Sequence, residues 1–196
     1  MEIRLKEIKG YGPLFKEAFP EDKDPVTVDH FAKAVGAFER TLVTPSPFDA
    51  FLSGKKEAMT EREKKGLKTF MEVGCTTCHS GGYVGGQIYQ KFGLLEPYWR
   101  YTKGEAIDEG RFAVTKNESE KYVFKVPVLR NVAKTAPYFH DGSVDALETA
   151  EWIMGKIQLG RNLSNEELGD IHAFLKSLTG KIPEDALKVP LLPSTE

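Results

Sequence analysis

The sequence predicts a mainly α-helical fold, and three observations support that prediction. Apolar residues recur at helical spacing towards both ends of the 196-residue chain, behind residues that can cap a helix. Between these parts, residues 80 to about 143 are rich in Gly, Pro and aromatic residues and lack a sustained helical period. A short run with two cysteines and a histidine, residues 75–79, follows one of the predicted helices. With 40% hydrophobic residues, the chain can bury the core of one domain, with or without an extension.

Four predicted helices account for the periodic parts. They begin at the capping residues Thr27, Thr60, Ser143 and Ser164, and the second and fourth have the glutamate of a capping box, Glu63 and Glu167. The first helix carries the apolar stripe Val28, Phe31, Val35, Phe38 and Leu42, and the third carries Leu147, Ala150, Met154 and Ile157. Prolines at positions 45 and 47 end the first helix, and the fourth helix covers residues 168–178.

The run Cys75-Thr76-Thr77-Cys78-His79 has the spacing for covalent attachment of a c-type haem. On a helix, Cys75 and Cys78 lie one turn apart on the same side, so their thiols can bond the two vinyl groups of one porphyrin. The imidazole of His79 is then the proximal ligand of the iron. We therefore expect a cytochrome-c-like helical domain whose long irregular loops wrap one covalent haem.

Two other interpretations of the cysteine pair are less favourable. A thioredoxin-type redox pair follows a strand, whereas the residues before Cys75 have the pattern of a helix. A structural zinc site would need its remaining ligands from His30, His140 and His172, which do not have the spacing of a zinc finger.

The second axial ligand of the iron is open on the sequence alone. The helix of His79 also carries Met71, which cannot reach the opposite haem face, and Met59 lies at the cap of that helix. Met154, on an apolar helix face, is far enough along the chain to reach it, although such a methionine is more often core filling. His172 fits a partly buried, hydrogen-bonded role better, and His140 suits a polar role near the haem edge.

Composition and charge exclude some classes of partner. The 27 basic and 29 acidic residues give a formal net charge of −2, which supports neither nucleic-acid binding nor a basic membrane patch. The sequence contains neither an apolar run of membrane-spanning length nor a signal peptide. Thioether attachment takes place in oxidising, exported compartments, so we expect a periplasmic protein whose signal sequence is not present in this chain.

Several motifs, in order and at compatible distances, make the chain similar to the bacterial dihaem cytochrome c peroxidases. The similarity spans nearly the whole chain. The motifs are Phe38-Glu39-Arg40-Thr41-Leu42-Val43-Thr44, Ser46-Pro47-Phe48-Asp49, Gly74-Cys75-Thr76-Thr77-Cys78-His79, Phe124-Lys125-Val126-Pro127, Leu129-Arg130-Asn131-Val132, Thr135-Ala136-Pro137-Tyr138-Phe139-His140-Asp141-Gly142 and Gln158-Leu159-Gly160.

This resemblance implies roles for particular residues. Cys75, Cys78 and His79 match the attachment site of the high-potential, electron-accepting haem of the family, and Met154 matches its methionine ligand. In relatives of the MauG type a tyrosine replaces that methionine, so Met154 argues against the MauG variant. The carbonyl groups of Thr135 and Pro137 match positions that help to bind Ca²⁺ between the two haems, a site that we expect to be weak or absent here.

The chain resembles only the C-terminal part of the family, because a second haem motif, the peroxidatic haem and its acid-base glutamate are not in it. We expect residues 1–55 to form a helical segment packed on a haem-binding domain of residues 56–183, with an extended tail of residues 184–196. The resemblance implies electron transfer from a small cytochrome c or cupredoxin to an N-terminal peroxidatic haem domain, and it allows a homodimer. The chain alone is predicted to be a poor peroxidase. The alternatives are a stand-alone monohaem electron carrier and, less favoured, a zinc-bound structural module.

Overall fold

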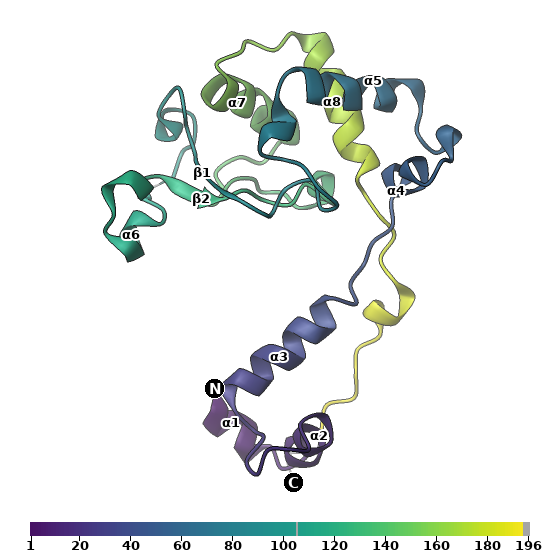
Figure 1. Cartoon of the computed structure of the whole chain (residues 1–196), viewed down its shortest axis with the longest axis vertical. Coiled ribbons are helices and arrows are strands. Elements are labelled where there is room, and N and C mark those ends of the chain that lie inside the picture. The colour runs from purple at the N-terminus through teal and green to yellow at the C-terminus, as the bar shows by residue number, and fades with distance from the viewer. Residues whose placement is uncertain (105, 194–196) are drawn as a thin grey trace. The chain divides into compact units, whose positions relative to one another are not determined.

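The computed structural model describes residues 1–104 and 106–193, and it confirms the mainly α-helical fold (Figure 1). The α-helices are α1 (Glu2–Glu7), α2 (Tyr11–Ala18), α3 (Val28–Glu39), α4 (Pro47–Leu52), α5 (Glu61–Glu72), α6 (Phe112–Thr115), α7 (Leu147–Leu159) and α8 (Asn165–Ser177). Short 3-10 helices are η1 (Lys56–Ala58), η2 (Cys75–Thr77), η3 (Tyr98–Arg100), η4 (Glu118–Glu120), η5 (Val132–Lys134) and η6 (Glu184–Leu187). In the described ranges, no helix has the length and apolar character that crossing a membrane requires.

The chain divides into two compact units, residues 1–44 together with 182 onwards, and residues 45–181. The predicted division into residues 1–55, 56–183 and 184–196 stays a prediction. Within the segment predicted as an extended tail, η6 is a short 3-10 helix, and residues 194–196 lie outside the described part of the chain.

In the first unit, the predicted cap of α3 is confirmed, because the Thr27 side chain accepts a hydrogen bond from the backbone N–H of His30. The helix ends at Glu39, before the predicted end of the stripe at Leu42. A tighter turn takes over there, in which the N–H groups of Thr41 and Leu42 donate to carbonyls three residues earlier. His30 is buried, stacks on Phe19 with ring centroids 3.9 Å apart, and contacts the Pro25 carbonyl at 2.8 Å.

The second unit is organised around the contact between α5 and α8. Both helices begin with the predicted capping boxes, Thr60 with Glu63 and Ser164 with Glu167. The two backbones approach so closely that a Cβ on Gly66 would lie 1.9 Å from the carbonyl oxygen of Asp170. Glycine at position 66 is therefore a condition for this helix crossing.

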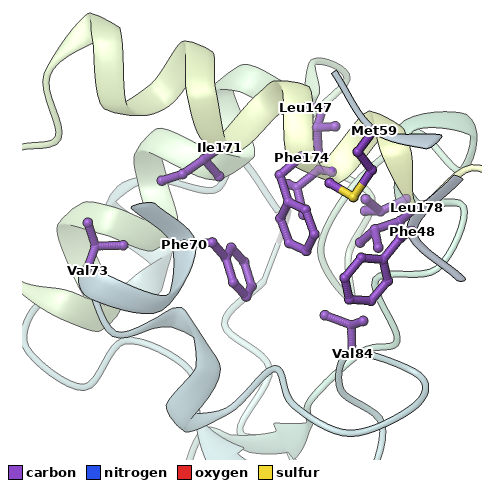
Figure 2. Close-up of a cluster of buried hydrophobic side chains, with 11 residues drawn as sticks. Phe48, Met59, Phe70, Val73, Val84, Leu147, Ile171, Phe174 and Leu178 are labelled. Atoms are coloured by element: carbon purple, nitrogen blue, oxygen red, sulfur yellow. The ribbon is translucent and has the colours of Figure 1, made fainter. Parts of the chain in front are cut away.

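Aromatic side chains fill the space beside that crossing. Phe174 of α8 lies between Phe70 of α5 and Phe48 of α4, with ring centroids 5.2 Å and 5.5 Å apart (Figure 2). The buried members of this first apolar cluster are Phe48, Met59, Phe70, Val73, Val84, Val132, Leu147, Ile171, Phe174, Leu175 and Leu178.

The long middle segment is largely irregular, as predicted, but it contains one small antiparallel sheet. Strand β1 (Tyr89–Lys91) pairs with β2 (Val123–Lys125), and Gln90 lies opposite Phe124. Beside the sheet is a second apolar cluster with the buried residues Tyr98, Val144, Ala150, Ile153 and Ile157, of which the last three belong to α7. This cluster anchors the middle segment to α7.

The prediction that Ser143 caps the third helix is wrong. Helix α7 begins at Leu147, behind Ala146, which makes no side-chain capping bond. Val144 is held in a bridge to Tyr138, and the Ser143 N–H donates to Asp141 Oδ1 at 3.1 Å, so this segment is a turn and not yet a helix.

The α5–α8 crossing gives a direct stability test. Gly66→Ala should destabilise the protein by about 1–3 kcal/mol, because the new methyl group can be accommodated only if two backbones separate. Chemical denaturation followed by circular dichroism measures this change. Gly169→Ala is the matched control on α8, where the Cβ would meet only the flexible end of Arg62. Equal stability of the two variants would contradict the proposed constraint.

Candidate haem attachment site

The cysteine motif follows α5 through a sharp turn. Gly74 adopts a left-handed conformation with φ of 102°, which ends the helix and starts η2. Cys75 and Cys78 therefore lie in a single 3-10 turn, and not in the regular α-helix that the sequence analysis assumed. The carbonyl of Cys75 accepts hydrogen bonds from the N–H groups of Cys78 at 3.2 Å and His79 at 2.9 Å. The turn thus holds both thiols and the imidazole on one short, rigid piece of backbone.

The imidazole of His79 is buried, with 9% of the residue exposed, and lies beside Phe70 at a centroid distance of 6.5 Å. Its Nδ1 atom is fully buried and has no partner in hydrogen-bonding geometry among the described residues. Burial lowers the pKa of His79, while backbone groups of Val84 and Pro127 act in the opposite direction. The neutral imidazole is the form that binds a metal.

Both cysteines are free thiols. Burial is the main cause that raises the pKa of Cys75 to about 11, so its thiol is protonated at neutral pH. Reactive redox pairs have lowered thiol pKa values, and zinc binds thiolate, so this environment favours neither alternative. The part of the chain that the structure describes also contains no group of three or more His, Cys, Asp or Glu side chains placed for a metal ion.

These residues fit a covalently bound haem. The two thiols and a neutral histidine are the donor set that thioether attachment and proximal ligation require. A glycine opposite the imidazole makes room for it, because a Cβ on Gly85 would lie 3.1 Å from His79 Nδ1 and 2.2 Å from the carbonyl oxygen of Pro127. The fit rests on the donor set and on this close backbone approach.

Met154 lies on α7 and is half-buried, unlike its neighbours Ile153 and Ile157, which are 2% and 0% exposed. In the described ranges it belongs to neither apolar cluster. This placement is not typical of a methionine that fills the core, and it is compatible with a role of the thioether as an iron ligand.

The motif Gln158-Leu159-Gly160 ties the end of α7 to two other segments. The Gln158 side chain accepts from the N–H of Gly93 at 2.9 Å and donates to the Lys91 carbonyl at 2.8 Å. Leu159 packs beside Gly74, 3.8 Å from where its Cβ would be, directly before the cysteine turn. Helix α7, which carries Met154, is thereby fixed next to the attachment turn.

A second clamp joins two further motifs that carry the resemblance. The Arg130 guanidinium makes a two-pronged ion pair with Asp49, with both N–O distances 2.8 Å, and also donates to the Gly82 carbonyl. It lies over the ring of Phe48 at 5.3 Å. This single side chain connects α4, the loop after His79 and the segment before η5.

The remaining candidate residues lie on the surface. Thr135 and Pro137 are both exposed in the turn after η5, where their carbonyl groups are the candidate calcium ligands. His140 is exposed and stacks on Phe124, with ring centroids 4.2 Å apart, as part of an aromatic group.

Sequence reasoning missed the role of Glu151. This glutamate of α7 is buried, and its Oε1 lies 3.0 Å from Nδ1 of His172 on α8. The partly buried, hydrogen-bonded role expected for His172 agrees with this contact. A signal existed for Glu151, because it lies four residues after Leu147 and three before Met154, on the predicted apolar face.

The helices and the cysteine turn define a mainly α-helical domain of cytochrome-c-like fold, and a solved structure supports this class. A MauG-like protein associated with microbial copper homeostasis has a TM-score of 0.74 at 26% identity, over 92% of this chain and 61% of that one. A family model described as di-haem cytochrome c peroxidase matches residues 1–57. The chain belongs to the dihaem cytochrome c peroxidase family.

Two relatives illustrate the similarity. The cytochrome c551 peroxidase of Pseudomonas aeruginosa is 47% identical over 100% of this chain and 56% of its own length. That of Nitrosomonas europaea is 47% identical over 93% of this chain and 53% of its own length. The chain therefore spans about half the length of these curated relatives.

The glycine opposite His79 provides a test of the site geometry. Gly85→Ala should cost at least about 2 kcal/mol, because φ of 124° is unfavourable for alanine and its methyl group would collide with the Pro127 carbonyl. Urea unfolding measures the loss. Gly82→Ala, in the same loop and with open space at the Cβ, is the control and should change stability little. A Gly85→Ala protein as stable as the control would show that the loop does not constrain the imidazole.

Proposed function

We propose that this chain is the electron-accepting haem c domain of a bacterial cytochrome c peroxidase. Cys75 and Cys78 would attach one haem, and His79 and Met154 would supply the two protein ligands of its iron. The observation that carries the proposal is the single turn that presents two thiols and a buried, neutral imidazole. The names of the relatives support the peroxidase family, and the activity of a whole peroxidase requires more than this chain.

When bound, the haem supplies a centre that gains and loses one electron. His79 binds the iron through a neutral imidazole that burial favours. The thioether of Met154 favours the ferrous state and so raises the reduction potential. Buried apolar residues on this side, Phe70 and Val84 among them, exclude water from the imidazole. These properties suit reversible electron transfer without a change of ligands.

The partners that we propose follow from the family. A small cytochrome c or a cupredoxin donates electrons, and a peroxidatic haem in an N-terminal domain receives them. The protein acts in the periplasm, because thioether attachment requires an exported compartment. A stand-alone monohaem electron carrier is the second candidate, because one attachment motif with its histidine already supplies what a haem for electron transfer needs from the protein.

Haem attachment and peroxidase activity are tested on the same purified protein. A Soret band that survives acid-acetone extraction should show covalent haem, and a colourless, zinc-containing protein would contradict the proposal. With hydrogen peroxide and reduced cytochrome c, the isolated chain should turn over far below the ordinary enzymatic range of roughly 1–10³ s⁻¹. The reason is that an iron held by both His79 and Met154 would have no open position at which peroxide could bind and be given a proton by an acid-base group. Turnover within that range would mean that Met154 dissociates.

Met154→Ala should open one iron position and lower the reduction potential, because a sulfur ligand that stabilises ferrous iron is lost. The ferric wild type should show a long-wavelength methionine-to-iron charge-transfer band that the variant lacks. Met71→Ala is a suitable control, since Met71 is an exposed methionine on the helix of the attachment turn. An unchanged spectrum in Met154→Ala would exclude this ligand.

Calcium should bind weakly or not at all to the isolated chain. Thr135 and Pro137 offer two neutral carbonyl groups, whereas Ca²⁺ takes 6–8 oxygen ligands. Isothermal calorimetry with CaCl₂ should therefore show little heat. Tight binding would mean that further residues of this chain complete the site.

A further inference from the structure

A buried acid-base pair connects α7 and α8. Oε1 of Glu151 lies 3.0 Å from Nδ1 of His172, and the Glu151 side chain is only 4% exposed. The second carboxyl oxygen, Oε2, is fully buried and has no hydrogen-bond partner within the described residues. A buried carboxyl group with one oxygen unsatisfied is costly when it is ionised, because it has lost water on that side.

Among the described residues, His172 is the only basic side chain that contacts the Glu151 carboxyl group. On the outer side, Nε2 of His172 lies 3.2 Å from Glu148 Oε1, whose side chain is 65% exposed. In the described ranges, no lysine or arginine forms an ion pair with Glu151. The groups that act electrostatically on the two partners are Glu148 of α7, Lys176 of α8, Arg62 of α5, Cys75 of η2 and Tyr138 of the preceding loop.

These surroundings move the pKa values of both partners away from their usual ranges, so that the pair titrates close to neutral pH. Burial, and secondarily the charge of Glu148, raises the pKa of Glu151 to about 8. Burial also lowers the pKa of His172. Near pH 7 the pair therefore holds one proton between its two members and carries no net charge, and it loses that proton as the pH rises through about 8.

The two helices that carry the pair pack against the attachment turn: Leu159 of α7 lies next to Gly74, and Cys75 packs against the first apolar cluster, which includes Leu147 of α7 and Ile171 of α8. The charge of Glu151 contributes to the raised pKa of Cys75, which shows that the two side chains are within electrostatic range. Glu151 also precedes Met154 by three residues on α7, so both project from the same side of the helix. Charges interact more strongly where water is excluded, so a haem attached at this turn would be expected to act electrostatically on the buried Glu151 carboxyl group.

We propose that Glu151 and His172 form a proton-accepting pair coupled to reduction of the haem that Cys75 and Cys78 attach, an inference that rests on the proposed function. An external one-electron reductant supplies the electron to the iron, and water supplies one proton to the pair. One O–H or N–H bond forms, and the charge added by the electron is balanced by the proton. Glu151 thus acts as a tuning residue for the reduction potential, with His172 as its positioning partner.

The sign of the coupling follows from the charges. The ferric centre carries one more positive charge and so favours the deprotonated pair, whereas the ferrous centre favours the protonated pair. The reduction potential should therefore fall as the pH rises through the range in which the pair titrates. If one proton is fully coupled to one electron, the equilibrium constant for reduction changes tenfold per pH unit. This corresponds to a change of 59 mV in the reduction potential of a one-electron couple.

Spectroelectrochemical titration of the holo-protein between about pH 6 and pH 10 tests the proposal. The wild-type potential should fall with pH, and Glu151→Gln should remove most of that slope. Glu148→Gln is the matched control, because it changes an exposed carboxyl group on the same helix that contacts the same histidine. It should retain the slope and only move it to lower pH, since the Glu148 charge that raises the pKa of Glu151 is lost. A pH-independent wild-type potential, or an unchanged slope in Glu151→Gln, would overturn the proposal.

A second measurement tests the coupling on the wild-type protein alone. Nuclear magnetic resonance of His172 should give a higher apparent pKa for the pair in ferrous than in ferric wild-type protein. Equal values in the two oxidation states would refute the coupling even if Glu151→Gln did not fold. Failure of the proposed function is a separate result, since it would appear earlier as the absence of covalent haem after acid-acetone extraction.

Discussion

The close contact between α5 and α8 is the constraint on which the candidate site depends. Helix α5 leads through Gly74 directly into the turn with both cysteines, so the position of α5 determines where the thiols and His79 lie. Helix α8 supplies Phe174 to the shared core and His172 to the buried pair. Gly66 has no side chain, so the two backbones can approach each other closely at this point. The positions of the core, the attachment turn and the acid-base pair all depend on this approach.

Local sequence signals predicted those parts of the fold that local interactions determine. The capping boxes of Thr60 and Ser164 satisfy N–H groups within one turn, so they could be recognised without tertiary information. Ser143 does not cap α7, because the next residue, Val144, is held in a bridge to Tyr138, a turn contact that the helical pattern does not reveal. The motif at Cys75 predicts haem attachment from five consecutive residues, whereas the contact of Glu151 with His172 depends on how two helices cross, which no local pattern specifies.

Much of the resemblance to the peroxidase family is carried by residues that hold the scaffold together. The Arg130 side chain links α4 to two loops, and the Gln158 side-chain amide forms hydrogen bonds with the backbone of Lys91 and Gly93, at the end of β1. Neither side chain belongs to the proposed ligand set. These motifs therefore indicate a shared framework around the attachment turn, and the chemistry that we propose rests on Cys75, Cys78, His79 and Met154.

The clamps and the helix crossing also have a consequence for how the chain reaches its native state. Asp49 and Arg130 are 81 residues apart, and Arg62 and Asp170 are separated by 108. Short-range contacts normally allow helical proteins to fold fast, but here the defining contacts close very long loops, whose entropy must be lost before the contacts form. The protein thus combines helical secondary structure with side-chain contacts of high sequence separation, and its folding should be correspondingly slow for an α-helical domain.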